Sequence, residues 1–244
     1  MRGLALSLTV FLMAVGAIPS ASAAAERLRQ YFIDYYADFR DENGTRYVLK
    51  NRKVDVVVEV EDPVARKGIL SVIADLKDKG VTNIEISENR ESANLLIKST
   101  AAIREELKKN KEFYQRYFDT PDELESRAAS IKNTTACDIL KNARAPTSKP
   151  HLSIFQKANT KRIDVAYVLV DRLASIPAKV KCATVGVLMA FGFRPNLNSS
   201  IPSINQGNQS QFKPTDEDVD ALKFLNSDAV KDVQPFEMLL KKLN

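Results

Sequence analysis

The chain has 244 residues, of which 44% are hydrophobic and 27% are charged, so it can bury a core, and intrinsic disorder is excluded as its main state. It has no tryptophan and a single histidine. The single histidine excludes metal sites built on two imidazoles and leaves one imidazole for any catalytic triad or dyad. The formal net charge of +5 comes from interspersed acidic and basic residues, which argues against a nucleic-acid partner.

The single histidine, His151, lies between Pro150 and Leu152, with no second histidine, cysteine or carboxylate at ligand spacing. We therefore interpret it as a loop or surface residue. The sequence predicts no metal site and no cofactor.

Residues 1–23 have the pattern of a signal peptide. Arg2 precedes an apolar run over residues 4–18, and Ala21 and Ala23 form a small-x-small cleavage site. The run is shorter than the roughly 20 residues that span a bilayer, and no later stretch is long enough. We predict cleavage, export to the periplasm or the medium, and no transmembrane segment in the mature chain.

The chain has two cysteines, Cys137 and Cys182. Because exported proteins mature in an oxidising compartment, the simplest prediction is a disulfide between them. The alternative is a pair of buried free thiols.

An aromatic stripe predicts the first helix, over residues 25–40. Its aromatic residues recur at intervals of three and four, which makes the stripe a packing face; they include Tyr31, Phe32, Tyr35 and Tyr36.

A β-branched strand is predicted at residues 54–60, followed by a helix that begins at Asp62-Pro63 and ends at Gly80. Short strands at 83–87 and 93–98 complete a β-α-β-β order. This order suggests a small mixed sheet with the helix across one face.

Residues 101–132 are predicted to form two helices separated at Thr120-Pro121, with their many charges on a solvated face. A proline-containing loop at 145–150 follows. We predict one domain over residues 24–244, with an N-terminal portion at 24–145 and a C-terminal portion at 150–244.

The C-terminal portion begins with the strongest predicted strand, over residues 163–170. A helix without charges over most of its length follows at 178–192 and is predicted to be buried on every side, with Gly192 at its end. A polar loop at 195–214 leads to a helix that Thr215 and Asp218 are predicted to cap, and a last helix is expected at 235–243.

These motifs, taken in order, resemble a family of exported bacterial proteins called domain of unknown function 2927, hereafter the 2927 family. In that family a helix reads Cys-x-x-Glu-Glu-x-x-Gln, which is similar to the His-Glu-x-x-His signature of zincins. The resemblance implies an α+β, zincin-like fold with helices packed on a small mixed sheet. The residues that carry it are the cysteine-headed helix from Cys182, Pro202-Ser203-Ile204-Asn205, and the helix that begins with Thr215-x-x-Asp218.

The three polar positions of the family helix are lost in this chain, where Val185, Gly186 and Met189 occupy them. Valine and glycine side chains neither ligate zinc nor transfer a proton, and a thioether is a poor zinc ligand. The resemblance therefore does not carry metal-dependent hydrolysis over to this chain.

Two functions remain open from the sequence. The first is a catalytically degenerate, zincin-like domain that binds a protein or polymer of the cell envelope, or has a structural role there. The alternative is a peptidase-like hydrolase with a non-standard acid and base drawn from Asp164, Asp171 and Asp218.

Overall fold

The structure is a computed structural model. It describes residues 21–36, 39–40, 45–49, 53–90, 93–115, 118, 120–132, 135–141, 166–206, 211–231 and 233–243. The predicted signal peptide as far as residue 20, the predicted loop at 145–150, His151 and Asp164 lie outside these residues.

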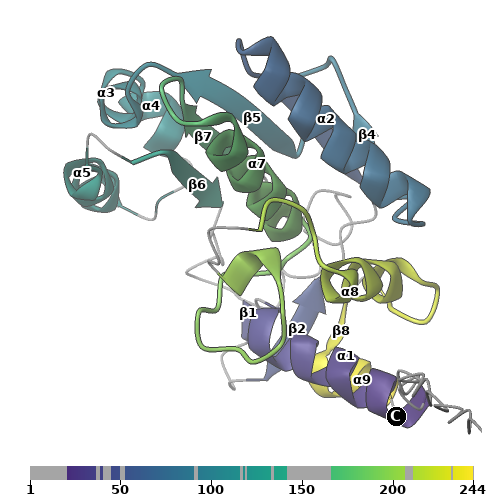
Figure 1. Cartoon of the computed structure of the whole chain (residues 1–244). Helices are drawn as coiled ribbons and strands as arrows, with labels where there is room; N and C mark the ends of the chain where they lie inside the picture. The colour runs from purple at the N-terminus through teal and green to yellow at the C-terminus, as the bar shows by residue number, and fades with distance from the viewer. Residues whose placement is uncertain are drawn as a thin grey trace, which may run out of the picture.

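Within the described residues, five strands form one sheet in the order β4-β3-β5-β7-β6 (Figure 1). Four strands are parallel to their neighbours, and β6 at one edge is antiparallel to β7. The strands are β3 (Val54–Glu59), β4 (Ile84–Ile86), β5 (Leu95–Thr100), β6 (Cys137–Lys141) and β7 (Ala166–Asp171).

The sheet is buried on both faces, as expected for parallel strands. One side of each central strand faces the larger core cluster, which contains Val58, Ile97 and Val168. The other side faces a smaller cluster, which contains Leu96 and Tyr167. This explains why the strands read as nearly continuous apolar runs.

Helices cover both faces (Figure 1). The larger cluster lies under α2 (Pro63–Asp78) and α7 (Ile176–Ala190). The smaller cluster lies under α3 (Ile103–Lys109), α4 (Lys111–Tyr114) and α5 (Pro121–Ser130).

The two helices on the larger cluster approach each other closely. A Cβ atom at Gly68 of α2 would lie 2.8 Å from Val180 Cγ2 of α7, so glycine is what permits this approach. The ammonium group of Lys179, which is buried, donates a hydrogen bond of 3.1 Å to Asp62, and Asp62 also caps α2. The two helices are therefore held together by a close contact at Gly68 and by an ion pair whose lysine is buried and whose aspartate is partly exposed.

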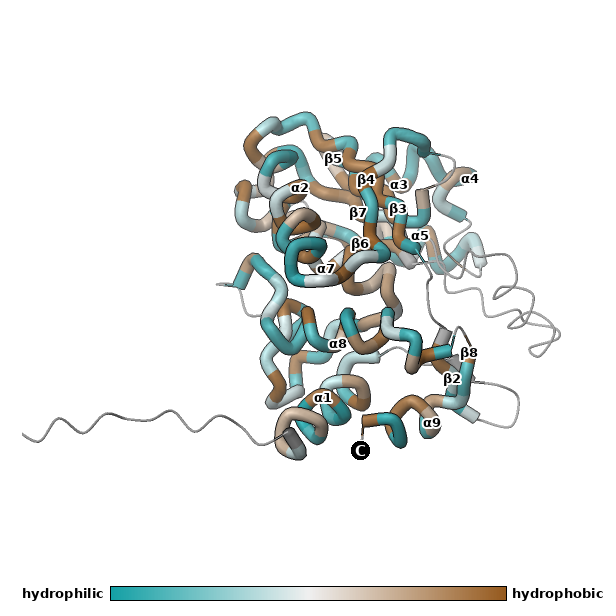
Figure 2. The backbone as a smooth tube through the Cα atoms, turned by 90° about the vertical axis from the view of Figure 1, so that its right-hand side faces the viewer, coloured by the Kyte–Doolittle hydropathy of each residue, from teal (hydrophilic) through white to brown (hydrophobic). Residues whose placement is uncertain are grey.

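A second group of elements lies below α7 and the central sheet in Figure 2. It contains a three-stranded antiparallel sheet in the order β1-β2-β8 and the helices α1, α8 and α9. Their bounds are α1 (Ala21–Tyr35), β1 (Phe39–Arg40), β2 (Arg46–Leu49), 3₁₀ helix η2 (Ile204–Gln206), α8 (Asp216–Asn226), β8 (Val233–Pro235) and α9 (Phe236–Lys241).

The aromatic face of α1 joins this group to the end of α7. Tyr31, Phe32 and Tyr36 each contact the ring of Phe193, with centroid distances of 5.5, 5.7 and 5.5 Å. All three side chains are fully buried, so the prediction of a packing face is confirmed.

The predicted mixed α+β class is confirmed, with several differences in the elements. The first helix ends at Tyr35, and the region after residue 101 breaks at Asn110 as well as at Thr120. Gly80 and Gly192 follow α2 and α7 with φ angles of 94° and 98°, which favour glycine.

The prediction that the helix at 178–192 is buried on every side is not confirmed. Its inner positions are buried, but Lys181, Val185 and Met189 are partly exposed. No helix in the part of the chain that the structure describes is long and apolar enough to cross a membrane.

Candidate functional site

Helix α7 carries the positions at which the resemblance places a catalytic motif. It begins after Ser175, whose hydroxyl accepts a hydrogen bond from the amide of Ala178, and Pro177 lies in its first turn. It then lies across β7 and β6, where its apolar residues join the larger core cluster.

Gly186 faces the sheet. A Cβ atom built on it would lie 2.3 Å from Val168 Cγ2 on β7 and 3.8 Å from Leu95 Cδ1 on β5. The first distance is far below van der Waals contact, so this position has no room for a side chain. The position at which the resemblance places the second glutamate is therefore a helix-to-sheet contact in this chain.

Val185, one residue earlier, has a different environment. It packs against the larger cluster and also lines an open groove of about 610 Å³ between α7 and β6. We call this the α7–β6 groove, and its walls include Cys137, Ile139, Ala178, Lys181, Val185 and Phe212.

The walls of the α7–β6 groove are mostly apolar. Among its described lining residues, Ser175 and Lys181 are the polar ones. Burial lowers the pKa of the Lys181 ammonium below its usual value. Met189, the third of the positions at which the resemblance places the motif, is partly buried and is not among these lining residues.

Phe212 is held beside α7 by a side chain of that helix. The Thr184 hydroxyl donates a hydrogen bond of 2.8 Å to Val180 O and lies 3.4 Å from Phe212 O. Phe212 is 37% exposed and lines the groove.

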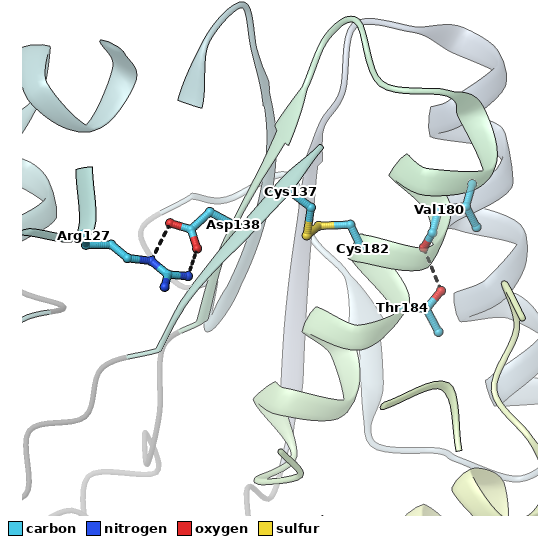
Figure 3. The surroundings of a disulfide bond; sticks show 6 residues. All are labelled: Arg127, Cys137, Asp138, Val180, Cys182 and Thr184. Atoms are coloured by element: carbon cyan, nitrogen blue, oxygen red, sulfur yellow. Dashed lines mark hydrogen bonds and ion pairs between the residues drawn. A yellow bond between two sulfur atoms is a disulfide. The ribbon is translucent and has the colours of Figure 1, made fainter. Parts of the chain in front are cut away.

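A disulfide joins the two walls of the groove (Figure 3). Cys137 on β6 is bonded to Cys182 on α7, with a Cα–Cα distance of 6.0 Å, within the range for an unstrained bridge. The predicted pairing is therefore present, and both cysteines line the groove.

The neighbouring residue on β6 faces the other way, as strand geometry requires. Figure 3 shows Asp138 pointing away from α7 toward Arg127 of α5. Its buried carboxylate accepts two hydrogen bonds from that guanidinium, and these raise the pKa of Arg127. The edge strand is thus bound on one face by a disulfide and on the other by an ion pair.

A second polar cluster joins α1, η2 and α8. The carboxylate of Asp218 accepts hydrogen bonds from the Tyr31 hydroxyl at 2.5 Å, the Ser203 hydroxyl at 2.5 Å, the Ile204 amide at 3.0 Å and the Thr215 amide at 2.8 Å. Tyr31, Ser203 and Asp218 are fully buried.

Thr215 completes this cluster. Its hydroxyl accepts from the Asp218 amide at 3.0 Å, which closes the capping box, and donates to Pro202 O at 3.1 Å. Burial raises the pKa of Tyr31 well above its usual range, and the adjacent Asp218 raises it further, so the phenol stays protonated and donates. The oxygens of Tyr31, Ser203 and Asp218 are all engaged and these three side chains are fully buried, so this part of the cluster links elements and offers no access to a substrate.

The carboxylates considered for a non-standard hydrolase do not share a site in the described residues. Asp171 accepts a hydrogen bond of 2.7 Å from the Leu173 amide in the turn after β7, whereas Asp218 belongs to the buried cluster. Across the described ranges, no group of three or more His, Cys, Asp or Glu residues is placed to hold a metal ion.

The structure therefore separates the residues that the resemblance singled out. Gly186 packs against the sheet, Val185 lines a groove, and Asp218 forms a buried cap. The sequence did not point to Tyr31 as the partner of Asp218, since the two are 187 residues apart.

Comparison with known proteins identifies no relative of this chain. No family model matches the chain, and neither the curated proteins nor the solved structures contain a significant match. The likeness to the 2927 family therefore remains a prediction from the motifs.

Proposed function

We propose that this chain is an exported binding protein of the cell envelope, a catalytically degenerate relative of the 2927 family whose ligand occupies the α7–β6 groove. The observation that carries the proposal is the groove itself. Its volume of about 610 Å³ lies in the range of small-molecule sites, and its walls are mostly apolar.

The lost catalytic positions support a binding role. Val185 lines the groove with an apolar side chain, and Gly186 lies against Val168 where no catalytic side chain fits. A cleft that served chemistry in relatives would here offer an apolar surface to a ligand.

The disulfide supports export. Bridges such as Cys137–Cys182 form and persist in oxidising compartments, in agreement with the predicted signal peptide at residues 1–23.

A neutral, polarity-sensitive dye tests the proposal. N-phenyl-1-naphthylamine is titrated into the mature wild type, into Ala178→Trp, which fills the groove from the first turn of α7, and into Leu197→Trp. Leu197 is 71% exposed and is not among the described groove residues, so it is the matched control.

We expect the wild type and Leu197→Trp to bind the dye alike, and Ala178→Trp to bind at least about tenfold more weakly. The melting temperatures should be similar in all three proteins. Equal binding by Ala178→Trp, or no binding by the wild type, contradicts the proposal. Cleavage of a peptide library by the wild type that is lost in Asp171→Asn would favour the hydrolase instead.

A further inference from the structure

We infer that the mature protein contacts the surface of an anionic lipid bilayer with the end of the central sheet at which the parallel strands finish. The contact is made by exposed apolar side chains that have basic residues beside them. The inference goes beyond the proposed function and does not depend on it, because it uses a surface outside the described lining of the α7–β6 groove.

Three large apolar side chains are exposed at this end of the sheet. Leu173 is 87% exposed, Val64 is 58% exposed and Ile176 is 39% exposed. Leu173 lies in the turn between β7 and α7, Ile176 is the first residue of α7, and Val64 lies in the first turn of α2. We call these three residues the strand-end patch. Grouped apolar exposure, unlike scattered single residues, marks a contact surface for a protein or a membrane.

Val64 and Ile176 are neighbours because of how the two helices cross. Helices α2 and α7 follow parallel strands, so both begin at the same edge of the sheet and run in the same direction. They approach most closely at Gly68 and Val180. One helical turn earlier in each helix come Val64 and Ile176.

Leu173 is brought to the same surface by contacts between the turns. The preceding residue, Arg172, donates a side-chain hydrogen bond of 2.7 Å to Glu61 after β3 and a backbone hydrogen bond of 2.7 Å to Thr100 O at the end of β5. Because β5 lies between β3 and β7, the exposed Ala101 lies between the two turns. The strand-end patch therefore spans one surface, from α2 to the turn after β7.

The charges around the strand-end patch favour an anionic surface. Arg66 and Lys67 are exposed on α2 within three residues of Val64. The acidic side chains at this edge are already engaged, since Glu61 and Asp62 are paired with basic residues and Asp171 accepts a hydrogen bond from a backbone amide. Basic residues beside apolar ones are typical of peripheral proteins, whose apolar groups enter the bilayer boundary while the cations remain among the anionic headgroups.

The shape of the strand-end patch favours a bilayer over a protein partner. A side chain as exposed as Leu173 projects from its turn with few protein neighbours. A protein partner must supply a pocket of matching shape for such a projection. A fluid bilayer surrounds it without one, because burial of apolar surface is non-directional.

Flotation with lipid vesicles tests the inference. The protein is the mature chain of residues 24–244, because the apolar run of the predicted signal peptide would bind vesicles by itself. The vesicles contain either pure phosphatidylcholine or an equal mixture of phosphatidylcholine and phosphatidylglycerol.

Two double variants are compared with matched controls. Val64→Gln with Leu173→Gln removes apolar side chains from the strand-end patch, and Leu197→Gln with Met238→Gln removes exposed apolar side chains elsewhere. Arg66→Gln with Lys67→Gln removes the basic residues beside the patch. Its control is Lys77→Gln with Lys79→Gln, which removes two exposed charges at the opposite end of α2.

We expect the wild type to bind the mixed vesicles, and to bind pure phosphatidylcholine at least about fivefold more weakly. The apolar variant of the strand-end patch should bind the mixed vesicles at least about tenfold more weakly than the wild type does. The basic variant should also lose about tenfold. Both controls should bind like the wild type, and all melting temperatures should be similar, because the substituted side chains are exposed.

A single tryptophan identifies the part of the molecule that enters the lipid, because the chain has no tryptophan of its own. On addition of mixed vesicles, the emission of Leu173→Trp should shift to shorter wavelength, and brominated phosphatidylcholine should quench it. The emission of Leu197→Trp should not change.

Failure of the wild type to bind the mixed vesicles overturns the inference, as does unchanged binding by the apolar variant. Equal binding to the two kinds of vesicle shows that the anionic surface is wrong. An unchanged emission of Leu173→Trp in protein that floats with the vesicles shows that another surface makes the contact. If the wild type forms a dimer that the apolar variant lacks, and does not float, the strand-end patch joins two copies of the chain. The dye titration of the groove is a separate measurement, so each of these outcomes leaves the proposed function standing.

Discussion

The packing around Gly186 explains why this position of α7 holds a glycine and not the glutamate of the Cys-x-x-Glu-Glu-x-x-Gln motif that the chain resembles. Glycine within a helix costs about 1 kcal/mol relative to alanine, so its presence in α7 needs a reason in the packing. The reason is Val168, whose Cγ2 would lie 2.3 Å from an added Cβ. Val168 of the sheet fills the space that a side chain at position 186 would need, so any larger residue there must displace Val168.

We therefore predict that Gly186→Ala lowers the free energy of unfolding by about 1–2 kcal/mol, although alanine is the better helix former. The same change in a Val168→Ala background should be neutral or stabilising, because the clashing methyl group is absent. Urea denaturation of the four proteins in this double-mutant cycle measures the coupling. Additive effects of the two substitutions would show that the contact is not the cause.

Asp218 is the second residue whose surroundings decide its role. Its carboxylate accepts four hydrogen bonds in a fully buried position. We expect Asp218→Asn to lower the free energy of unfolding by about 3 kcal/mol. The asparagine side chain replaces one accepting oxygen by an NH2 group, which is a donor and would face the donors that the carboxylate now accepts from. Asp220→Asn, at an exposed position on the same helix, should change stability by less than about 0.5 kcal/mol. Similar thermal denaturation curves for the two variants would count against the buried cap.

The edge strand β6 is the element whose attachment matters most for the groove. Among the described residues it pairs with β7, and it is also bound by the disulfide to α7 and by Asp138 to Arg127. The bridge closes a span of 45 residues.

In the chain-entropy model, closure of this span stabilises the fold by about 4 kcal/mol. Replacing both cysteines by alanine should therefore lower the midpoint of chemical denaturation strongly. A reductant should lower the midpoint of the wild type and leave that of the double variant unchanged. Equal stability of the oxidised wild type and the double variant would exclude a stabilising role for the bridge.

Helices α3 and α4 are joined to the sheet by Glu106. Burial alone would raise the pKa of this carboxyl, but hydrogen bonds from Lys98 at 2.7 Å and Tyr114 at 2.8 Å lower it below its usual value. A lowered folded-state pKa stabilises the protein above the unfolded value of about 4.3, and this stabilisation disappears as the pH falls through the folded value.

The free energy of unfolding should therefore fall below about pH 4.3, and it should fall less in Glu106→Gln. Glu105→Gln is the matched control, because the neighbouring side chain is 69% exposed. Denaturation curves at a series of pH values compare the three proteins. Identical acid profiles for the wild type and Glu106→Gln would refute the assignment.

At the scale of the whole molecule, the N-terminal helix carries the predicted junction between signal and mature chain. α1 begins at Ala21, and Ala23 and Ala24 are exposed in its first turn. Cleavage after Ala23 would leave the buried aromatic face, from Tyr31 onward, intact.

We predict that the full-length chain, expressed in a bacterium and recovered from the periplasm, has the mass of residues 24–244. The variant Ala21→Leu with Ala23→Leu should keep residues 1–23, because the cleavage site requires small side chains. Intact-mass spectrometry decides the outcome. Retention of residues 1–23 by the wild type would show that export or cleavage was predicted wrongly.

The sequence predicted those parts of the fold that depend on neighbours along the chain. The aromatic helix, whose end was predicted at residue 40 and lies at Tyr35, the strand rich in β-branched residues and the cap at Thr215 arise from local periodicity or from a contact within three residues. The strands β1, β2 and β8 were not predicted, because segments of two to four residues are too short to show alternation.

The candidate site depended on the tertiary structure. Val185 and Gly186 are adjacent apolar residues on one helix, and their sequence does not show which of them faces the sheet and which the groove. That assignment follows from where α7 lies across β6 and β7. The sequence suggested which cysteines pair and where helices begin, because redox compartment and capping are properties of composition and short spacing. The contacts between Tyr31 and Asp218 and between Val168 and Gly186 were decided by packing, because they join residues that only the folded chain brings together.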